Sequence, residues 1–230
     1  MSISPDQIIL FQQGWFTINA TIAFTWLLII ILSLGSWLIT RRLSSEGTLT
    51  RWQNLLEVLI SGIKGQIREV SRQEPGPYLP FVGTLFIFIA ISNILAIVPG
   101  YIPPTSSLST TAALAICVFV AVPVFGIAQR GILSYLKQYI QPTFFMLPFN
   151  LIGEISRTLA LAVRLYGNMM SGTIIVAILL TITPIVFPVV MQALGLLTGL
   201  IQAYIFAILA MVYIASASKA HQELEKKGER

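Results

Sequence analysis

Long apolar stretches alternate with short polar segments along the chain. The stretches cover residues 18–39, 79–98, 111–128, 148–183 and 185–218. About 20 helical residues cross the ~30 Å hydrocarbon core of a bilayer, and each stretch is close to that length or longer. We therefore predict an all-α membrane protein with five transmembrane helices, in which residues 1–230 form a single membrane domain.

A further segment, residues 50–72, follows a different pattern. Its apolar residues recur at three- and four-residue spacings between charged ones, which is typical of an amphipathic helix. They are Trp52, Leu55, Leu56, Leu59, Ile60, Ile63, Ile67 and Val70. We interpret the segment as a helix on the cytoplasmic membrane surface. The alternative is a helix packed in a small soluble subdomain, but the loop is too short to form its own core.

The composition agrees with a membrane protein and excludes several classes of function. Of the 230 residues, 56% are hydrophobic and only 10% are charged, whereas about 25% of residues are charged in a soluble domain. A single Cys and a single His exclude a Cys-based metal cage, a disulfide framework within the chain and a Ser-His-Asp active site. The net charge of +5 does not indicate nucleic-acid binding, because the basic residues form no contiguous face.

The basic residues collect in three segments of the chain. Twelve of the 14 follow the first, third or fifth span: Arg41, Arg42, Arg51, Lys64, Arg68, Arg72, Arg130, Lys137, Lys219, Lys226, Lys227 and Arg230. Residues 1–17, 99–110 and 183–184 contain no Lys or Arg. The positive-inside rule therefore predicts that residues 1–17 lie outside and residues 219–230 form a cytoplasmic tail. No positive charge precedes the first span, so we expect a permanent helix there rather than a signal peptide.

The two remaining basic residues, Arg157 and Arg164, fall inside the fourth span together with Glu154. An Arg near the centre of a membrane helix costs about 2.5–3.5 kcal/mol on insertion scales and indicates function by default. Arg157 lies near the start of the span, where it can pair with Glu154 or reach the interface. Arg164 lies ~24 Å along the helix from Pro148, too deep to reach the interface without a strong tilt. We expect a structural role for Arg157 and a functional role for Arg164.

Arg164 belongs to a polar stripe on its helix. At about 100° per residue, Arg157, Arg164, Asn168 and Ser171 fall within an arc of roughly 60°, so the stripe must face protein or water.

The fifth span supplies a surface that could face this stripe, through Gly195, Gly199, Gln202 and Phe206. Gln202 can accept a hydrogen bond from the Arg164 guanidinium, although a Gln in a membrane helix often makes a purely structural bond. A fixed cation in the membrane is suited to meet a mobile carboxylate of another subunit, because an opposite charge favours the ionised acid.

Four strings in the sequence resemble subunit a of the membrane (Fo) sector of rotary F-type ATP synthases. SRTLALAVRLYGNMMSG is similar to the family's arginine helix, with the essential arginine at Arg164 and the asparagine at Asn168. LIQAYIFAILAMVYIASA is similar to the final helix, with its glutamine at Gln202. FIAISNILAIVP matches the stretch with Asn93, and GILSYLKQYIQPTFFMLPFN resembles the cyanobacterial and chloroplast version. A divergent sodium-type form is the other relative that we consider.

The resemblance implies a stator channel beside a rotating ring of c subunits that carry carboxylates. The last two long helices would form a tilted hairpin against the ring. Protons or sodium ions would pass through two offset half-channels, separated by Arg164, and Asn168 and Gln202 would take part in ion translocation. The expected partners are the c ring, the b-type subunits of the peripheral stalk, other ATP synthase subunits and membrane lipid. The chain would bind no cofactor, catalyse nothing on its own, and lie in a bacterial plasma (inner) membrane or a thylakoid membrane.

The chain departs from the family pattern in the outer half-channel. Thr173 stands where the family commonly has Glu or His, Gly195 stands at the complementary position, and Ser107 stands where an Asp is usual. The resemblance leaves two explanations: a water-filled, hydroxyl-lined path, or a sodium-coupled form whose ion is bound by neutral oxygens. We favour sodium, but the ion, the ring stoichiometry and the physiological direction do not follow from this chain. Candidate half-channel residues are Asn93, Ser107, Glu154, Arg157, Ser171 and Thr173.

Two other functions are alternatives. An independent secondary ion transporter would ordinarily show a repeated half and interrupted helices near the bilayer midplane, and five spans do not divide in two. A membrane-embedded enzyme would need a nucleophile, a base or a metal cluster that this composition scarcely offers.

Overall fold

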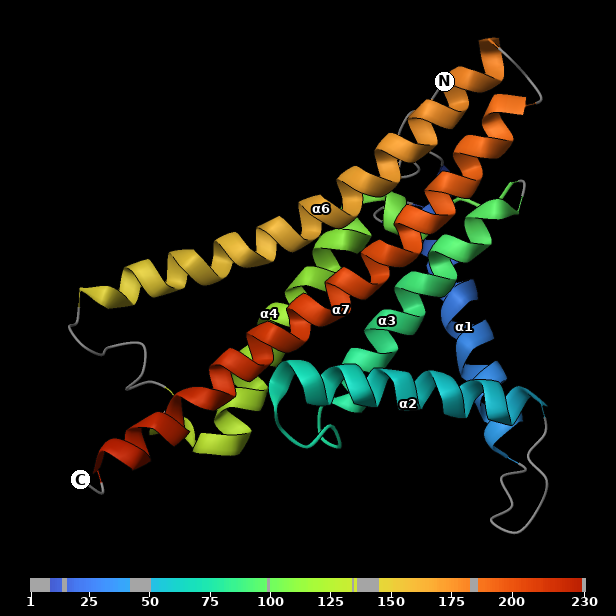
Figure 1. Cartoon of the computed structure of the whole chain (residues 1–230). Helices are drawn as coiled ribbons and strands as arrows, with labels where there is room; N and C mark the ends of the chain where they lie inside the picture. Colours follow the sequence, from blue (N-terminus) through green and yellow to red (C-terminus); the bar gives the residue numbers. More distant parts are fainter. Residues whose placement is uncertain are drawn as a thin grey trace.

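The computed structural model describes residues 9–13, 16–41, 51–98, 100–133, 135, 145–182 and 186–228, and it is almost entirely helical. Figure 1 shows the arrangement. The main helices are α1 (Ala20–Thr40), α2 (Arg51–Ser71), α3 (Leu79–Ile94), α4 (Leu108–Arg130), α6 (Met146–Ile182) and α7 (Val186–Gly228). Helices α1, α4, α6 and α7 each contain a stretch long and apolar enough to cross a membrane, and α3 forms a fifth such stretch together with the residues up to Ile97. The predicted fold class, five apolar spans and one amphipathic helix, is therefore confirmed. The predicted turn at residues 183–184 lies outside the described residues.

The structure adds a short hairpin before the first span. Strands β1 (Ile9–Gln13) and β2 (Phe16–Asn19) pair antiparallel, and β2 leads directly into α1 at Ala20. The sequence analysis placed residues 1–17 at the outer N-terminus and predicted no strand there. The alternation of apolar and polar residues in Phe16–Asn19 is only four residues long and runs directly into the first apolar span, so it did not stand out as a strand.

Helices α1 and α2 differ in how much of their surface the rest of the chain covers. On α1, large apolar side chains such as Trp26, Leu34 and Trp37 are more than half exposed, which is the surface expected of a helix in contact with lipid. On α2 only one side is covered, and Ile67 packs with Tyr78 and residues of α7 in a buried cluster. The two-sided character predicted for residues 50–72 is thus present in α2.

The core lies where α3, α4, α6 and α7 meet. Its buried members are mostly Ala, Leu, Ile and Val, and Phe206 of α7 is completely buried among them. Small residues on α7, namely Ala203, Ala207 and Ala210, are at most 5% exposed. Because lipid tails are as apolar as these side chains, close packing of small residues is a main source of attraction between membrane helices. Helix α7 packs against α2, α3, α4 and α6, and so it holds the bundle together.

Helices α6 and α7 are much longer than a perpendicular crossing requires. They have 37 and 43 residues, which corresponds to about 55 and 65 Å at ~1.5 Å per residue. Figure 1 shows them side by side near the end of α6 and the start of α7, and apart where α6 begins and α7 ends. The predicted cytoplasmic tail, residues 219–230, continues α7 as helix up to Gly228.

A 3-10 segment replaces the end of the predicted second span. Helix α3 stops at Ile94, and a 3-10 turn covers Leu95–Ile97. A second 3-10 turn, Pro104–Ser106, precedes α4 and is buried. These turns bring the connection between α3 and α4 back against α6 and α7, where it contributes to the site described next.

Candidate functional site

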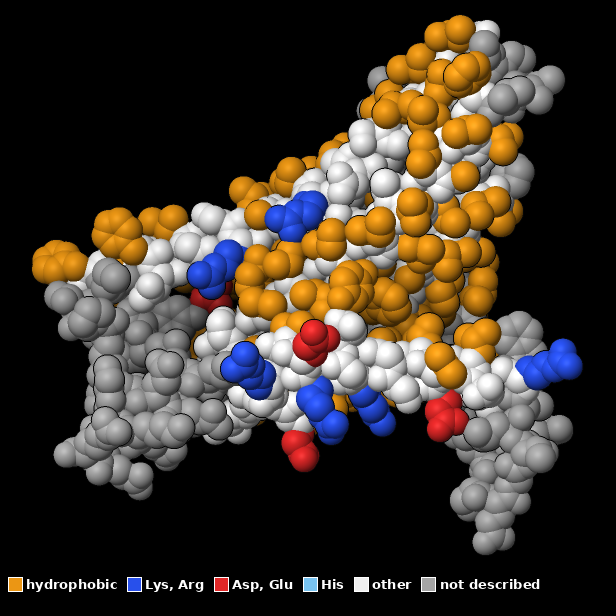
Figure 2. Space-filling model, viewed as in Figure 1, with side chains coloured by type: hydrophobic (Ala, Val, Ile, Leu, Met, Phe, Trp, Pro, Cys, Tyr) orange, Lys and Arg blue, Asp and Glu red, His pale blue; other side chains and the backbone are white. Residues whose placement is uncertain are grey.

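The polar stripe predicted on the fourth span is present on α6. The side chains of Arg157, Arg164, Asn168 and Ser171 are all exposed there. Figure 2 shows the two basic side chains of α6 on the surface, with an acidic side chain beside the one nearer the start of the helix. Arg164 has no hydrogen-bond or ion-pair partner among the residues that the structure describes. The arginine is thus presented to whatever covers this face of α6.

Gln202 meets Asn168 rather than Arg164. The Nδ2 atom of Asn168 donates a hydrogen bond of 2.8 Å to Oε1 of Gln202. The structure does not show the expected bond from the arginine to the Gln202 carbonyl; the donor there is the amide one turn further along α6. Gln202 is only 2% exposed, and its Nε2 atom is buried without a hydrogen-bond partner in the described part of the chain.

A cavity of about 580 Å³ lies beside Asn168, between the second half of α6, the first half of α7 and the α3–α4 connection. We call it the turn-side cavity, because it lies toward the α6–α7 turn. Its polar lining is neutral: Asn93, Tyr101, Asn168, Thr173 and Gln192. Among the described lining residues none is charged, so the cavity offers only amide and hydroxyl groups to an ion or to water.

Two of the six predicted half-channel residues line the turn-side cavity. Asn93 and Thr173 are part of its lining, and so is Gly195, the second position at which the sequence departs from the family. The Thr173 hydroxyl donates to the carbonyl of Met170 at 2.8 Å. Small side chains at positions 173 and 195 leave the cavity open where larger ionisable groups would fill it.

Ser107 and Ser171 do not line this cavity. Ser107 is completely buried at the start of α4, where its hydroxyl shares a hydrogen bond of 2.7 Å with Ser109. Ser171 is exposed on the stripe and donates to the carbonyl of Asn168 at 3.1 Å. Their predicted part in ion conduction has no support from these positions.

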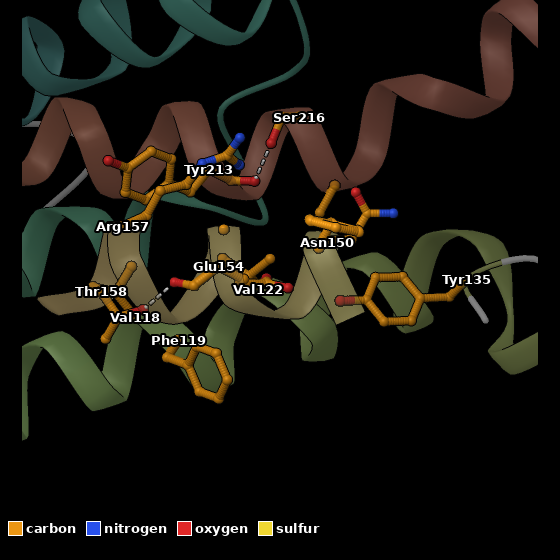
Figure 3. Close-up of a pocket in the computed structure, with 13 residues that line it drawn as sticks. Val118, Phe119, Val122, Tyr135, Asn150, Glu154, Arg157, Thr158, Tyr213 and Ser216 are labelled. Carbon is orange, nitrogen blue, oxygen red and sulfur yellow. Dashed lines mark hydrogen bonds between the residues drawn. The ribbon is translucent and has the colours of Figure 1, made fainter. Parts of the chain in front are cut away.

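A second cavity, of about 530 Å³, lies between the first half of α6, α4 and the second half of α7. We call it the tail-side cavity. Figure 3 shows Glu154 and Arg157 projecting from α6 between Tyr213 of α7 and the apolar residues of α4. Asn150, Thr158 and Ser216 add further polar groups. Both ionisable residues that the sequence placed on this side are therefore brought to one open cavity.

Arg157 has an aromatic neighbour that the sequence analysis did not identify. Its guanidinium carbon lies 5.7 Å from the centroid of the Tyr213 ring, within the range of a cation–π contact. The sequence analysis expected pairing with Glu154 or a position at the interface. The structure places the guanidinium at the Tyr213 ring instead, with Glu154 in the same cavity lining.

Tyr101 and Gln192 are polar lining residues that sequence reasoning missed. Burial raises the pKa of Tyr101, so its hydroxyl stays protonated at neutral pH. The buried Ser92 hydroxyl is close enough to offset part of that rise, but the two groups do not meet hydrogen-bond geometry. Gln192 donates to the carbonyl of Ala96 at 3.2 Å. A polar Gln in the apolar fifth span could have been recognised from the sequence as a candidate lining residue. The position of Tyr101 could not, because it depends on how the α3–α4 connection folds against the helices.

Arg164 lies between the two cavities along α6. The tail-side lining on this helix ends at Thr158, and the turn-side lining begins at Asn168. Six and four residues separate these positions from Arg164, or about 9 and 6 Å along the helix. Arg164 itself lines neither cavity. The arrangement is two open spaces on opposite sides of one exposed cation.

Comparisons with known proteins agree with the family indicated by the sequence. The family model of the ATP synthase A chain matches residues 22–215. The chain is 61% identical to ATP synthase subunit a 2 of Acaryochloris marina, over 96% of this chain and 95% of the relative. It is 60% identical to ATP synthase subunit a of Albidiferax ferrireducens over the full length of both, and 57% identical to ATP synthase subunit a 1 of Chlorobaculum parvum, over 97% and 99%. The chain therefore belongs to the ATP synthase A chain family.

Proposed function

We propose that this chain is the stator subunit that conducts ions in the membrane sector of a rotary F-type ATP synthase. The observation that carries the proposal is the position of Arg164, exposed without a partner in the described chain and flanked by two cavities. One cavity would admit the ion and the other would release it. A fixed cation between them prevents a direct leak, because a cation in transit is repelled by it.

The stripe on α6 is the surface proposed to face the rotor. A carboxylate on a ring of c subunits would become ionised beside Arg164 and take up an ion again after it has passed. Arg164, Asn168 and Gln202 would form this contact, and Gln202 Nε2 is a buried donor still available to it. The b-type subunits of the peripheral stalk and the other ATP synthase subunits are the remaining proposed partners. In this proposal the chain has no catalytic activity and binds no cofactor; the ion is cargo.

The orientation of the chain follows from charge placement. The positive-inside rule puts the tail-side cavity toward the cytoplasm and the turn-side cavity toward the outside. The membrane would be a bacterial plasma membrane or a thylakoid membrane. Moving one charge through 100 mV releases about 2.3 kcal/mol, so several ions must pass for each ATP.

For the ion, the lining of the turn-side cavity supports either a hydrated path for protons or a path for sodium. The polar groups of the lining are neutral amides and hydroxyls, and such oxygens are suitable ligands for a hard cation. We propose sodium. The test is ATP hydrolysis by the purified complex at alkaline pH, with and without sodium. Stimulation by sodium supports the proposal, and identical rates in both conditions contradict it.

The alternative function, an independent secondary ion transporter, predicts a different assembly. The chain purified from its native membrane should bring with it a ring of small two-helix proteins that carry a carboxylate. Ion transport by this chain alone in vesicles, with no ring attached, would favour the transporter instead.

A further inference from the structure

We propose that Asn93, Thr105 and Gly199 form a polar clamp that sets the height of α7 and thereby places Gln202 opposite Asn168. These three residues come from α3, from the α3–α4 connection and from α7. In this view Asn93 and Thr105 are positioning residues. The inference rests on the proposed function, since it concerns how the site beside Arg164 is held.

The clamp is a chain of two buried hydrogen bonds. The Thr105 hydroxyl donates to Oδ1 of Asn93 at 2.6 Å, and Nδ2 of Asn93 donates to the backbone carbonyl of Gly199 at 2.8 Å. Thr105 is 0% exposed and Asn93 is 1% exposed. The Thr105 bond fixes which end of the Asn93 amide faces α7, because a hydroxyl that donates must meet the amide oxygen. The amide NH2 group is then directed at α7.

Glycine at position 199 allows the close approach of α7 to Asn93. A Cβ atom placed on Gly199 would lie 3.0 Å from Cβ of Asn93 and 3.2 Å from its Nδ2. The amide of Asn93 itself occupies the space that a side chain would need. A side chain at position 199 would require Asn93 or α7 to shift by a few tenths of an ångström, which would disturb the bond to the carbonyl.

The position of the clamp relative to the site gives it functional meaning. Gly199 precedes Gln202 by three residues, less than one turn, or about 4.5 Å along α7. Apolar packing between helices in lipid is a weak determinant of axial register, because lipid tails can replace each apolar contact. Buried hydrogen bonds are directional, and so they restrict the axial register of α7. A second polar tie, from Gln192 to the carbonyl of Ala96, holds the same side of α7 further toward the turn.

Thr105 offers the sharpest test, because it does not line the turn-side cavity. Thr105→Val keeps the shape of the side chain and removes the donor, whereas Thr105→Ser keeps the donor. The measured quantity is ions pumped per ATP hydrolysed by the assembled complex in vesicles. We expect Thr105→Val to lower this ratio about three- to tenfold, the range for one or two buried membrane hydrogen bonds, and Thr105→Ser to retain most of it. Equal ratios in the two variants would overturn the clamp.

Glycine substitutions provide an independent comparison. Gly199→Ala should lower the pumping ratio, since its Cβ meets Asn93. Gly83→Ala on α3 is the matched control, because Gly83 is also buried but a Cβ there meets nothing within 4 Å. A Gly199→Ala variant that pumps as well as Gly83→Ala would contradict the inference.

A double substitution separates positioning from general stability. If the clamp acts through Gln202, adding Thr105→Val to a Gln202→Leu variant should lower the ratio no further. Independent effects that multiply would mean that Thr105 only stabilises the fold, and the clamp would be rejected. Failure of the proposed function would give a different result: the Arg164→Ala variant would pump ions normally, whatever the effect of substitutions at Thr105. If Arg164→Ala fails to pump while Thr105→Val pumps normally, only the clamp is wrong.

Discussion

The two cavities on either side of Arg164 have similar volumes, about 580 and 530 Å³, but different chemistry. The turn-side cavity is lined by apolar side chains and a few neutral amides and hydroxyls. The tail-side cavity contains Glu154 and Arg157 beside Tyr213. An ion in the first cavity meets only dipoles, whereas an ion in the second meets full charges. Size should therefore limit passage through the first, and electrostatics should influence passage through the second.

In the proposed function, this difference would let the chain conduct ions without the acids that the resemblance led us to expect at positions 107 and 173. A neutral path requires room for water or for a partly hydrated ion, and small residues at positions 173 and 195 provide that room. On such a path the ion needs no proton-relay side chain, because water accompanies it. The small residues at positions 173 and 195 would then belong to the design of the proposed path.

The largest effect should come from removing the cation that separates the cavities. Arg164→Ala should abolish ATP-linked ion transport while the amount of assembled complex stays close to wild type, because Arg164 is exposed and makes no hydrogen bond or ion pair within the described chain. Ion accumulation in vesicles, normalised to assembled complex, measures this. Normal coupled transport in the variant would show that the cavities are separated by something else.

A large effect should also follow from filling the turn-side cavity. Gly195 lines it, and a Cβ added there meets nothing within 4 Å. Gly195→Leu should place its side chain in the path and slow ATP-driven transport by roughly tenfold, equivalent to ~1.4 kcal/mol of added barrier.

Gly195→Ala is the matched control, since a single methyl group leaves most of the cavity open. Its transport should stay within about twofold of wild type. If Gly195→Leu transports ions as fast as Gly195→Ala, the turn-side cavity is not on the ion path.

The sequence was sufficient to predict the features that depend on local pattern. A helix that crosses lipid must be long and apolar, so the five spans could be found from the positions of apolar residues along the chain alone. The stripe through Arg164 and Asn168 followed from helical periodicity, and the structure shows both side chains exposed on α6. The hairpin before α1 escaped notice because the alternation in β2 covers only four residues and merges with the apolar stretch of the first span.

The sequence was insufficient where two distant segments must be aligned. Whether Gln202 meets Arg164 or Asn168 depends on the relative height of α6 and α7, and a shift of one turn changes the partner. That height depends on contacts such as the one between Asn93 and Gly199, which are 106 residues apart in the chain. The lining position of Tyr101 likewise depends on the 3-10 turns that fold its loop against the helices.

The smallest effect should come from Arg157, the second arginine of α6. Arg157→Gln should reduce ATP-driven transport by less than about threefold, because its contact with the Tyr213 ring is worth only ~0.5–1 kcal/mol at a partly exposed site. Arg157→Lys is the control that keeps the charge, and it should transport ions better than Arg157→Gln if the charge matters to the tail-side cavity. Transport rates in vesicles decide between the outcomes. A loss in Arg157→Gln as complete as in Arg164→Ala would mean that the tail-side cavity depends on its cation as strongly as the barrier does, and the contrast between the two arginines would be false.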